Sequence, residues 1–304
     1  MTGLYYPNAR PHNALLGWPR ATDGILWSGG AWRTEYPVTN SRTVAVLGDT
    51  GDVSLGEVAR SVDLAPASTR LVGILPELTR VGLLVAIAHN WSISSQWRVR
   101  FFGDEAGALL VWEKPRGNVW GVAYPAGTLE WEDENFWTGG FRASELAGLV
   151  WNARVLVDPP VMVRRIEIDI WDEGNPAGYV QHGLIEVAET MRLPVNFGYG
   201  ADFGYQSRSL RIEAESGAIS TERRAKGRSF QGPIDLAPES WAASKFFEFQ
   251  RQADTVAPFW WEMKPLDVLE AHRSAFFARN ATLGLQKIVF HARRALALNL
   301  QEVL

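Results

Sequence analysis

The sequence of 304 residues contains no cysteine and only five histidines. The lack of cysteine excludes disulfides, iron–sulfur clusters, thiolate zinc sites and thiol nucleophiles, and leaves histidine as the only nitrogen ligand for a metal. The histidines show neither HxH nor HExxH spacing and are His12, His89, His182, His272 and His291. We therefore predict no metal and no cofactor, and a hydrogen-bonded structural role for each histidine.

Long apolar runs and an excess of one charge sign are also missing. The longest apolar stretch, Val81–Ala88, is too short to span a bilayer, and Met1–Arg10 lacks the basic-then-apolar pattern of a signal peptide. Thirty basic and 34 acidic residues give a net charge of −4, which provides no basic field for a polyphosphate backbone. We expect a soluble protein with no membrane insertion and no nucleic-acid partner.

Aromatic and turn-forming residues are abundant, with 14 Trp, 14 Phe, 28 Gly and 16 Pro. This composition is typical of many short strands joined by turns, in a sandwich or barrel. Val163–Trp171 alternates isoleucines with charged residues, as a half-buried strand requires. The turn Asp172–Gly178 and a return strand at Tyr179–Val187 then predict a hairpin.

Further alternating segments predict a two-sheet sandwich in the first part of the chain. These strands are expected at Arg70–Ile74, Val81–Ala88, Gln96–Phe102 and Ala108–Trp112. The stretch Pro194–Tyr205 is too irregular for a strand and too rich in glycine for a helix, so we place a domain boundary just before it.

The second part predicts one helix among further strands. The helix is expected at Pro238–Ala253, with an apolar face against a sheet formed by Ala242, Phe246, Phe249 and Ala253. The strands are expected at Ser207–Ala214, Arg228–Asp235, Phe259–Met263, Ser274–Arg279 and Gln286–Val303. Alternating leucines in the last strand predict that the chain ends inside a sheet.

The acidic and aromatic loop Leu129–Phe136, followed by Trp137, is the best candidate for a site. Its carboxylates include Glu132 and Asp133, and glycosidases use carboxylate pairs, but neighbouring residues on one loop do not flank a sugar from two sides. The alternatives are a solvated surface loop, sugar stacking on Trp131 or Trp137, and cation binding. We predict no catalytic residue and no enzyme.

Two other groups are candidate partner contacts. Trp260 and Trp261 point to opposite faces of a strand, so one is expected in the core and the other, taken as Trp261, toward a partner. A basic cluster is expected either to be exposed or to dock on an acidic neighbouring subunit, and it comprises Arg223, Arg224, Lys226 and Arg228.

Two long segments resemble the galactose-binding-like, discoidin-type jelly rolls of prophage tail proteins. "LVGILPELTRVGLLVAIAHNWSISSQWRVRFFGD" (Leu71–Asp104) resembles a strand, loop and strand of that module, and "RRIEIDIWDEGNPAGYVQHGLIEVAE" (Arg164–Glu189) resembles its closing hairpin. The second half is similar to the β domain of phage distal tail and minor tail proteins, with a helix ending near "FQRQADT", a "PFWW" strand and a terminal "LALNLQEVL" strand.

This resemblance implies a mainly β protein with an N-terminal arm (1–34), a jelly-roll β-sandwich (35–190) and a second β-sandwich or split-barrel domain carrying one helix (191–304). It implies a virion protein of the phage tail tip, assembled in the host bacterial cytoplasm as a homo-oligomeric ring, commonly a hexamer. Its expected partners are the tail tube protein and the baseplate hub or other tail-tip proteins. Jelly rolls of this family bind carbohydrate or calcium at loop ends, but no acidic cluster here matches residue by residue.

Two other functions remain open. The first is a carbohydrate-binding module for the host surface, which would use Trp131 and Trp137. The second is a glycan-cleaving enzyme built on the loop from Glu130 to Glu134.

Overall fold

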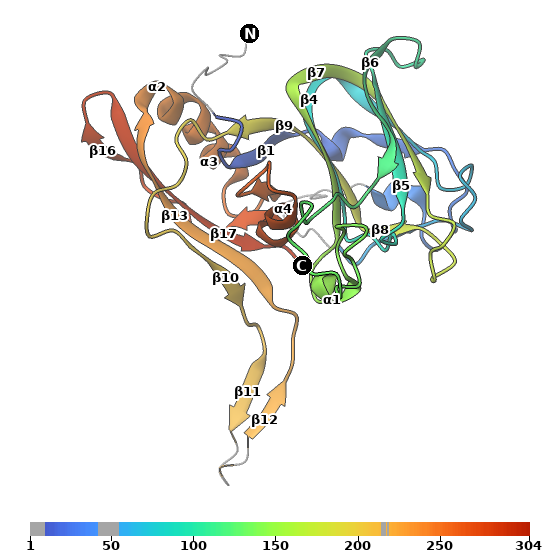
Figure 1. Ribbon diagram of the computed structural model, residues 1–304. Coiled ribbons are helices and arrows are strands. Elements are labelled where there is room, and N and C mark those ends of the chain that lie inside the picture. Colours follow the sequence, from blue (N-terminus) through green and yellow to red (C-terminus); the bar gives the residue numbers. More distant parts are fainter. Residues whose placement is uncertain (1–9, 42–54, 214–216, 218) are drawn as a thin grey trace. The chain divides into compact units, whose positions relative to one another are not determined.

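The computed structural model describes residues 10–41, 55–213, 217 and 219–304 (Figure 1). The chain is mainly β, as the sequence predicts, and the strand pairs described below are antiparallel. It divides into two compact units. The sandwich unit comprises Gly17–Met191 and Asp267–Arg273, and the ribbon unit comprises Met1–Leu16, Arg192–Leu266 and Ser274–Leu304. Strand β1 (Leu15–Arg20) contains the point where the chain passes between them.

Two long strands, β4 (Leu71–Ile87) and β7 (Asn152–Trp171), form the centre of the sandwich unit and pair along their length. The pairing is irregular near Pro76 and again opposite Pro159 and Pro160, because proline has no N–H to donate to a ladder. Figure 1 shows both strands curving. Each strand therefore contributes one half to each of two layers.

One layer joins the start of β4 and the end of β7 to three further strands. These are β2 (Leu26–Ser28), β5 (Gln96–Phe102) and β6 (Leu110–Asn118). The other layer joins the end of β4 and the start of β7 to β9 (Leu184–Arg192). A separate pair, β3 (Ala59–Arg60) with β8 (Gln181–His182), lies outside these layers, as do the helical turns η1 (Thr22–Gly24), η2 (Val38–Ser41), α1 (Ala143–Leu146) and α4 (Val268–Ser274).

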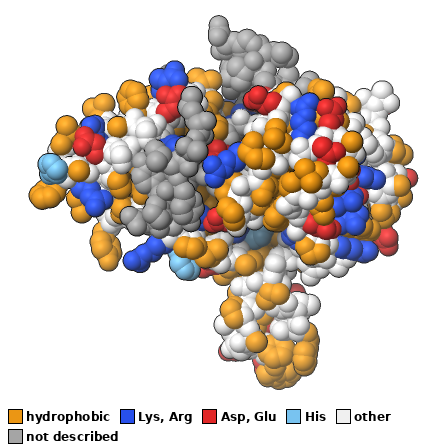
Figure 2. Space-filling model, turned by 90° about the horizontal axis from the view of Figure 1, so that it is seen from above, with side chains coloured by type: hydrophobic (Ala, Val, Ile, Leu, Met, Phe, Trp, Pro, Cys, Tyr) orange, Lys and Arg blue, Asp and Glu red, His pale blue; other side chains and the backbone are white. Residues whose placement is uncertain are grey.

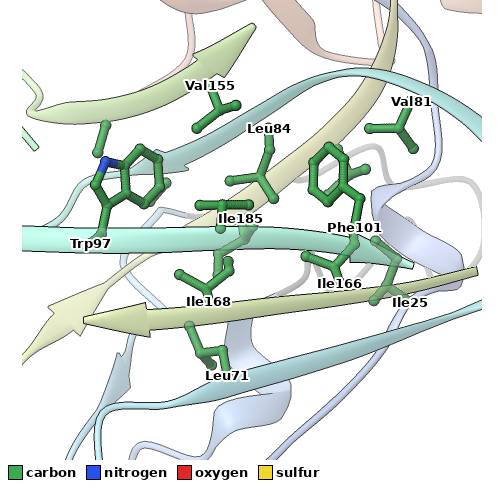
Figure 3. Close-up of a cluster of buried hydrophobic side chains, with 14 of the residues drawn as sticks. Ile25, Leu71, Val81, Leu84, Trp97, Phe101, Val155, Ile166, Ile168 and Ile185 are labelled. Carbon is green, nitrogen blue, oxygen red and sulfur yellow. The ribbon is translucent and has the colours of Figure 1, made fainter. Parts of the chain in front are cut away.

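The core of the sandwich unit lies between the two layers (Figure 3). Leu84, Val155 and Ile185 come from one layer and face Trp97 and Ile168 of the other. All five side chains are buried. Because apolar side chains from both layers meet here, the unit has a complete hydrophobic core of its own.

The hairpin predicted from β7 to its return strand is wrong. Strand β9 pairs with β4 and not with β7, so β4 lies between them. The intervening residues include β8, which pairs with β3 instead. Alternation and turn residues identify strands correctly here, but they do not specify which strands pair.

The charged face of β7 is also more buried than the alternating pattern predicts. Glu167 is 4% exposed and Asp169 is 7% exposed. Arginines from three segments cover these two carboxylates through ion pairs, and they are Arg70, Arg98, Arg100 and Arg165. The outer face of this layer is therefore a network of ion pairs rather than separate solvated charges.

The ribbon unit contains a sheet ordered β10-β13-β17-β15-β14, with β16 also paired to β17. Its strands are β10 (Asp202–Gln206), β13 (Gly227–Pro238), β14 (Phe259–Glu262), β15 (Ala275–Asn280), β16 (Lys287–Phe290) and β17 (Arg293–Glu302). The last strand lies inside this sheet, as predicted. Strand β10 overlaps the end of the stretch expected to be irregular, so that expectation is wrong for residues 202–205, because backbone pairing with β13 needs no alternating pattern. Residues 194–201 form neither a strand nor a helix, as expected.

The predicted helix is present as α2 (Glu239–Trp241), a π-helical turn (Ala242–Phe246) and α3 (Phe247–Ala253). The four residues of its expected apolar face are all buried, and the Phe249 ring meets the ring of Phe259 on β14 at 4.9 Å. No helix within the described ranges is long and apolar enough to span a membrane.

Strands β11 (Leu210–Glu213) and β12 (Ile219–Glu222) form a two-stranded ribbon, the β11–β12 ribbon, which projects from the β10–β13 pair (Figure 1). Every residue of these two strands is exposed. On the face of the molecule in Figure 2, hydrophobic side chains and charged side chains of both signs are interspersed.

Candidate functional site

The loop at residues 129–137, in the sandwich unit, is folded around the carboxylate of Asp133. The Glu130 amide donates to Asp133 Oδ2 at 3.0 Å, and the Arg142 guanidinium donates to Oδ1 at 3.4 Å. The Asp133 amide donates in return to the Glu130 carbonyl at 3.0 Å. Both carboxylate oxygens of Asp133 are thus engaged in holding the loop.

The second half of the loop closes around Asn135, which is 6% exposed. Its side-chain amide donates to the Gly140 carbonyl at 2.6 Å. The amides of Thr138 and Gly139 donate to the Asn135 carbonyl at 3.2 and 2.8 Å. These bonds give the loop a defined backbone, so its outward side chains have a fixed base.

Two indoles on this folded loop face solvent. Trp131 is 76% exposed and Trp137 is 90% exposed. The Trp137 ring has an edge contact with Phe136 at 5.0 Å, and Glu132 is also exposed. An exposed indole forgoes the large hydrophobic gain that burial would bring, and these two residues leave aromatic surface in contact with solvent.

Trp261, the predicted partner contact outside this loop, lies in the ribbon unit and is buried. Trp260 and Trp261 of β14 are both 0% exposed. The Trp261 ring lies 4.8 Å from that of Phe230, and Trp260 Nε1 lies 3.5 Å from a carboxylate oxygen of Glu262. The expectation that one of the two indoles faces outward is wrong, because both faces of β14 are covered.

The predicted basic cluster is divided by the fold. Arg223, Arg224 and Lys226 are exposed, but Arg228 is 1% exposed and forms an ion pair with Glu302. The Arg228 amide also donates to Glu302 Oε2 at 2.7 Å. Arg228 therefore belongs to the interior of the ribbon unit and not to a docking surface.

Two of the histidines are buried in the sandwich unit, His89 at 5% exposure and His182 at 0%. Burial lowers the pKa of His89 to about 3 and that of His182 to about 3. His182 Nε2 lies 2.8 Å from Ser41 Oγ, and His89 Nδ1 accepts from the Trp91 amide at 3.1 Å. Among the residues that the structure describes, no group of three or more His, Asp or Glu is arranged to hold a metal ion.

A second polar and aromatic surface of the sandwich unit was not predicted. We call it the tyrosine–arginine cluster, and it consists of Arg33, Tyr36, Arg60, Tyr179 and Gln181. The Arg60 guanidinium carbon lies 4.2 Å from the centre of the Tyr36 ring and 4.3 Å from that of Tyr179. The Arg33 guanidinium carbon lies 5.1 Å from the Tyr179 ring centre. All five residues are half-buried.

Backbone hydrogen bonds hold the segments of this cluster in place. The Arg33 amide donates to the Arg60 carbonyl at 2.9 Å, and the Arg60 amide donates to the Tyr36 carbonyl at 3.0 Å. The Asn90 side chain donates to the Tyr179 carbonyl at 3.0 Å. No local motif could have revealed this site, because Tyr179 and Gln181 lie more than 100 residues from the other three members of the cluster.

No protein-family model matches the chain, and no curated protein matches it. Solved structures with similar folds include a family 32 carbohydrate-binding module of NanJ from Clostridium perfringens, in complex with galactose. It is 12% identical, and the match covers 58% of this chain and 99% of that chain, with a TM-score of 0.35.

Two further solved structures match a similar share of this chain. The family 32 carbohydrate-binding module of EndoD from Streptococcus pneumoniae is 11% identical. The match covers 56% of this chain and 99% of that chain, with a TM-score of 0.34. The corresponding module of AlyQ, in complex with 4,5-unsaturated mannuronic acid, is 12% identical. The match covers 53% of this chain and 92% of that chain, with a TM-score of 0.30.

Proposed function

We propose that this protein binds carbohydrate without cleaving it, through the indoles of Trp131 and Trp137. The observation that carries the proposal is the 76% and 90% exposure of these two side chains on a loop with a defined backbone. The apolar faces of sugar rings stack on exposed indoles, and a preorganised loop lowers the entropy lost on binding. The Asp133 carboxylate supports this reading over catalysis, because it serves the fold of the loop.

Binding to a glycan array, followed by titration of the best ligand, tests this proposal. We expect Trp131→Ala and Trp137→Ala each to weaken binding about tenfold or more, as for aromatic anchors of an interface. Tyr199→Ala is the matched control, because Tyr199 is fully exposed but lies in the ribbon unit. No retained glycan, or equal affinity of all three variants and the wild type, would remove the proposal.

We infer a second function, assembly into a homo-oligomeric ring at a phage tail tip, from the β11–β12 ribbon. Its exposed side chains include Leu210, Ile212 and Ile219, which are 41%, 63% and 49% exposed. An isolated two-stranded ribbon is only marginally stable in water, and its apolar residues favour a cover supplied by a neighbouring copy. This role implies contacts with the tail tube protein and the baseplate hub, within a virion assembled in the bacterial cytoplasm.

The molar mass of the full-length protein in solution tests this second function. We expect a closed oligomer, six copies for the expected hexamer, and a shift to monomer in a variant carrying Leu210→Ser, Ile212→Ser and Ile219→Ser. Leu26→Ser is the control, because Leu26 is 65% exposed in the sandwich unit. Finding only monomers both in solution and in purified tail-tip fractions would exclude ring assembly.

A further inference from the structure

The tyrosine–arginine cluster holds two cations near a single aromatic ring. The guanidinium groups of Arg33 and Arg60 both lie within 5.1 Å of the centre of the Tyr179 ring. Both groups are positively charged, so the region around this ring has a positive potential that attracts anions. The arrangement is therefore favourable for a bound anion between or beside the two groups.

The neighbouring side chains leave part of this positive charge uncompensated. Arg60 donates through Nε at 3.1 Å and through one terminal nitrogen at 2.7 Å, both to the same oxygen of Gln181, which is neutral. Within residues 10–41, 55–213 and 219–304, neither Arg33 nor Arg60 forms an ion pair with a carboxylate. The contrast with β7 is clear, because there Arg98 and Arg100 lie against Asp169 at 2.8 and 3.3 Å.

The rigidity of the cluster favours recognition over a loose surface charge. Arg60 is fixed between two rings and bonded to Gln181, and the backbones that carry these residues are joined by hydrogen bonds. A guanidinium that is held in place loses little entropy when it binds a planar carboxylate through two parallel hydrogen bonds. Tyr36 and Tyr179 are half-buried, and Arg60 covers one face of each ring, so the tyrosines serve mainly to hold the guanidinium in place.

We propose that the tyrosine–arginine cluster binds the carboxylate of an acidic sugar residue, such as a uronic or sialic acid, within a polysaccharide. The inference rests on the proposed carbohydrate-binding function and adds to it a second site with its own ligand class. None of the cluster residues belongs to the loop at 129–137, so substitutions can remove one site and leave the other intact.

Titration calorimetry of the full-length protein tests the inference with a panel of oligomers of galacturonate, glucuronate, mannuronate and sialic acid. Each oligomer is paired with its methyl ester, which keeps the sugar and removes the charge. We expect at least one acid to bind about tenfold or more tightly than its ester, and this preference to weaken as salt rises. Equal affinity for the acid and the ester of every pair would overturn the inference.

Substitutions assign the effect to the cluster. We expect Arg33→Gln and Arg60→Gln each to abolish most of the preference for the acid while leaving affinity for the ester unchanged. Arg116→Gln is the matched control, because Arg116 also lies over an aromatic ring, 4.5 Å from the centre of Trp171, but outside the cluster. Arg33→Gln keeps the test valid if Arg60→Gln unfolds the protein, since the Arg33 side chain makes no hydrogen bond within the described ranges.

The outcomes separate the two proposals. If neutral glycans bind through Trp131 and Trp137 while Arg33→Gln and Arg60→Gln bind acids as the wild type does, the inference falls and the proposed function stands. If neither acidic nor neutral glycans bind, the proposed function falls and the inference falls with it.

Discussion

The sandwich unit and the ribbon unit expose apolar residues differently. In the sandwich unit, apolar side chains from two layers meet in one core, and the buried Glu167, Asp169 and Glu186 all pair with arginines. The ribbon unit also has a buried core and a buried ion pair, but it extends the fully exposed β11–β12 ribbon. The sandwich unit thus has a core between two layers, whereas the β11–β12 ribbon leaves its apolar side chains exposed on a projecting pair of strands.

We expect the largest loss of stability when the buried ion pair of the sandwich unit is broken. Glu186 is 0% exposed, and the Arg20 guanidinium donates to its two oxygens at 2.7 and 3.0 Å. We expect Glu186→Ala to lower the free energy of unfolding by about 3–5 kcal/mol, because the buried Arg20 guanidinium would lose both bonds to Glu186 and keep the more exposed Asp23, at 3.3 Å, as a carboxylate partner. Urea unfolding measures this change.

The exposed ion pair between Arg224 and Glu222 on the β11–β12 ribbon provides the control. We expect Glu222→Ala to change the free energy of unfolding by less than about 1 kcal/mol, because solvent screens this pair. Similar losses in both variants would contradict the contrast between the buried interior of the sandwich unit and the exposed ribbon.

Acid should destabilise the sandwich unit through its two buried histidines. The pKa of His89 and that of His182 fall to about 3 in the folded chain, whereas an unfolded histidine keeps a pKa near 6.5. The unfolded state therefore binds more protons between these values, so stability is full above pH 6.5 and falls as pH drops toward 3. The slope is roughly 1.4 kcal/mol per pH unit for each histidine.

Urea unfolding at pH 7.5, 5.5 and 4.5 checks this dependence. His182→Gln should reduce the slope, because it removes one of the two histidines that burial keeps neutral. A stability that is constant from pH 7.5 to 4.5 would show that neither buried histidine stays neutral in the folded state.

The smallest effects on stability are expected at the proposed binding surfaces. Trp137→Ala and Ile212→Ser should each change the free energy of unfolding by no more than about 0.5 kcal/mol, because neither side chain contributes to a core. Thermal unfolding of the free monomer measures this. A loss of 2 kcal/mol or more, on the order of that for a core truncation, would mean that the residue is part of the fold rather than of a recognition surface.

Local patterns predicted much of the fold. Alternation located the strand that ends at Trp171, and helical spacing identified the buried face containing Phe246 and Phe249. The prediction of one helix within residues 191–304 is wrong, because α4 is a second helix there, and its capping signal is local, since Asp267 Oδ1 accepts from the Glu270 amide at 3.0 Å. Strand order was not predictable in the same way, because β9 and β7 reach β4 through long-range pairing.

The candidate sites, like the strand order, could be predicted only where their residues are close together in the sequence. Trp131 and Trp137 could be identified because an aromatic, acidic loop is continuous in the sequence. Tyr36, Arg60 and Tyr179 could not, because their contacts exist only after three distant segments meet. Burial of Trp261 was equally hidden, since one strand alone does not indicate whether a second layer covers its other face.

Oxidative footprinting with mass spectrometry tests the central claim, that Trp131 and Trp137 form a carbohydrate-binding surface, most directly. Both indoles are exposed in the free protein and should oxidise readily. A saturating glycan selected from the array should protect these two residues and leave Tyr199 of the ribbon unit as reactive as before. Equal oxidation of Trp131 and Trp137 with and without the glycan would contradict the account.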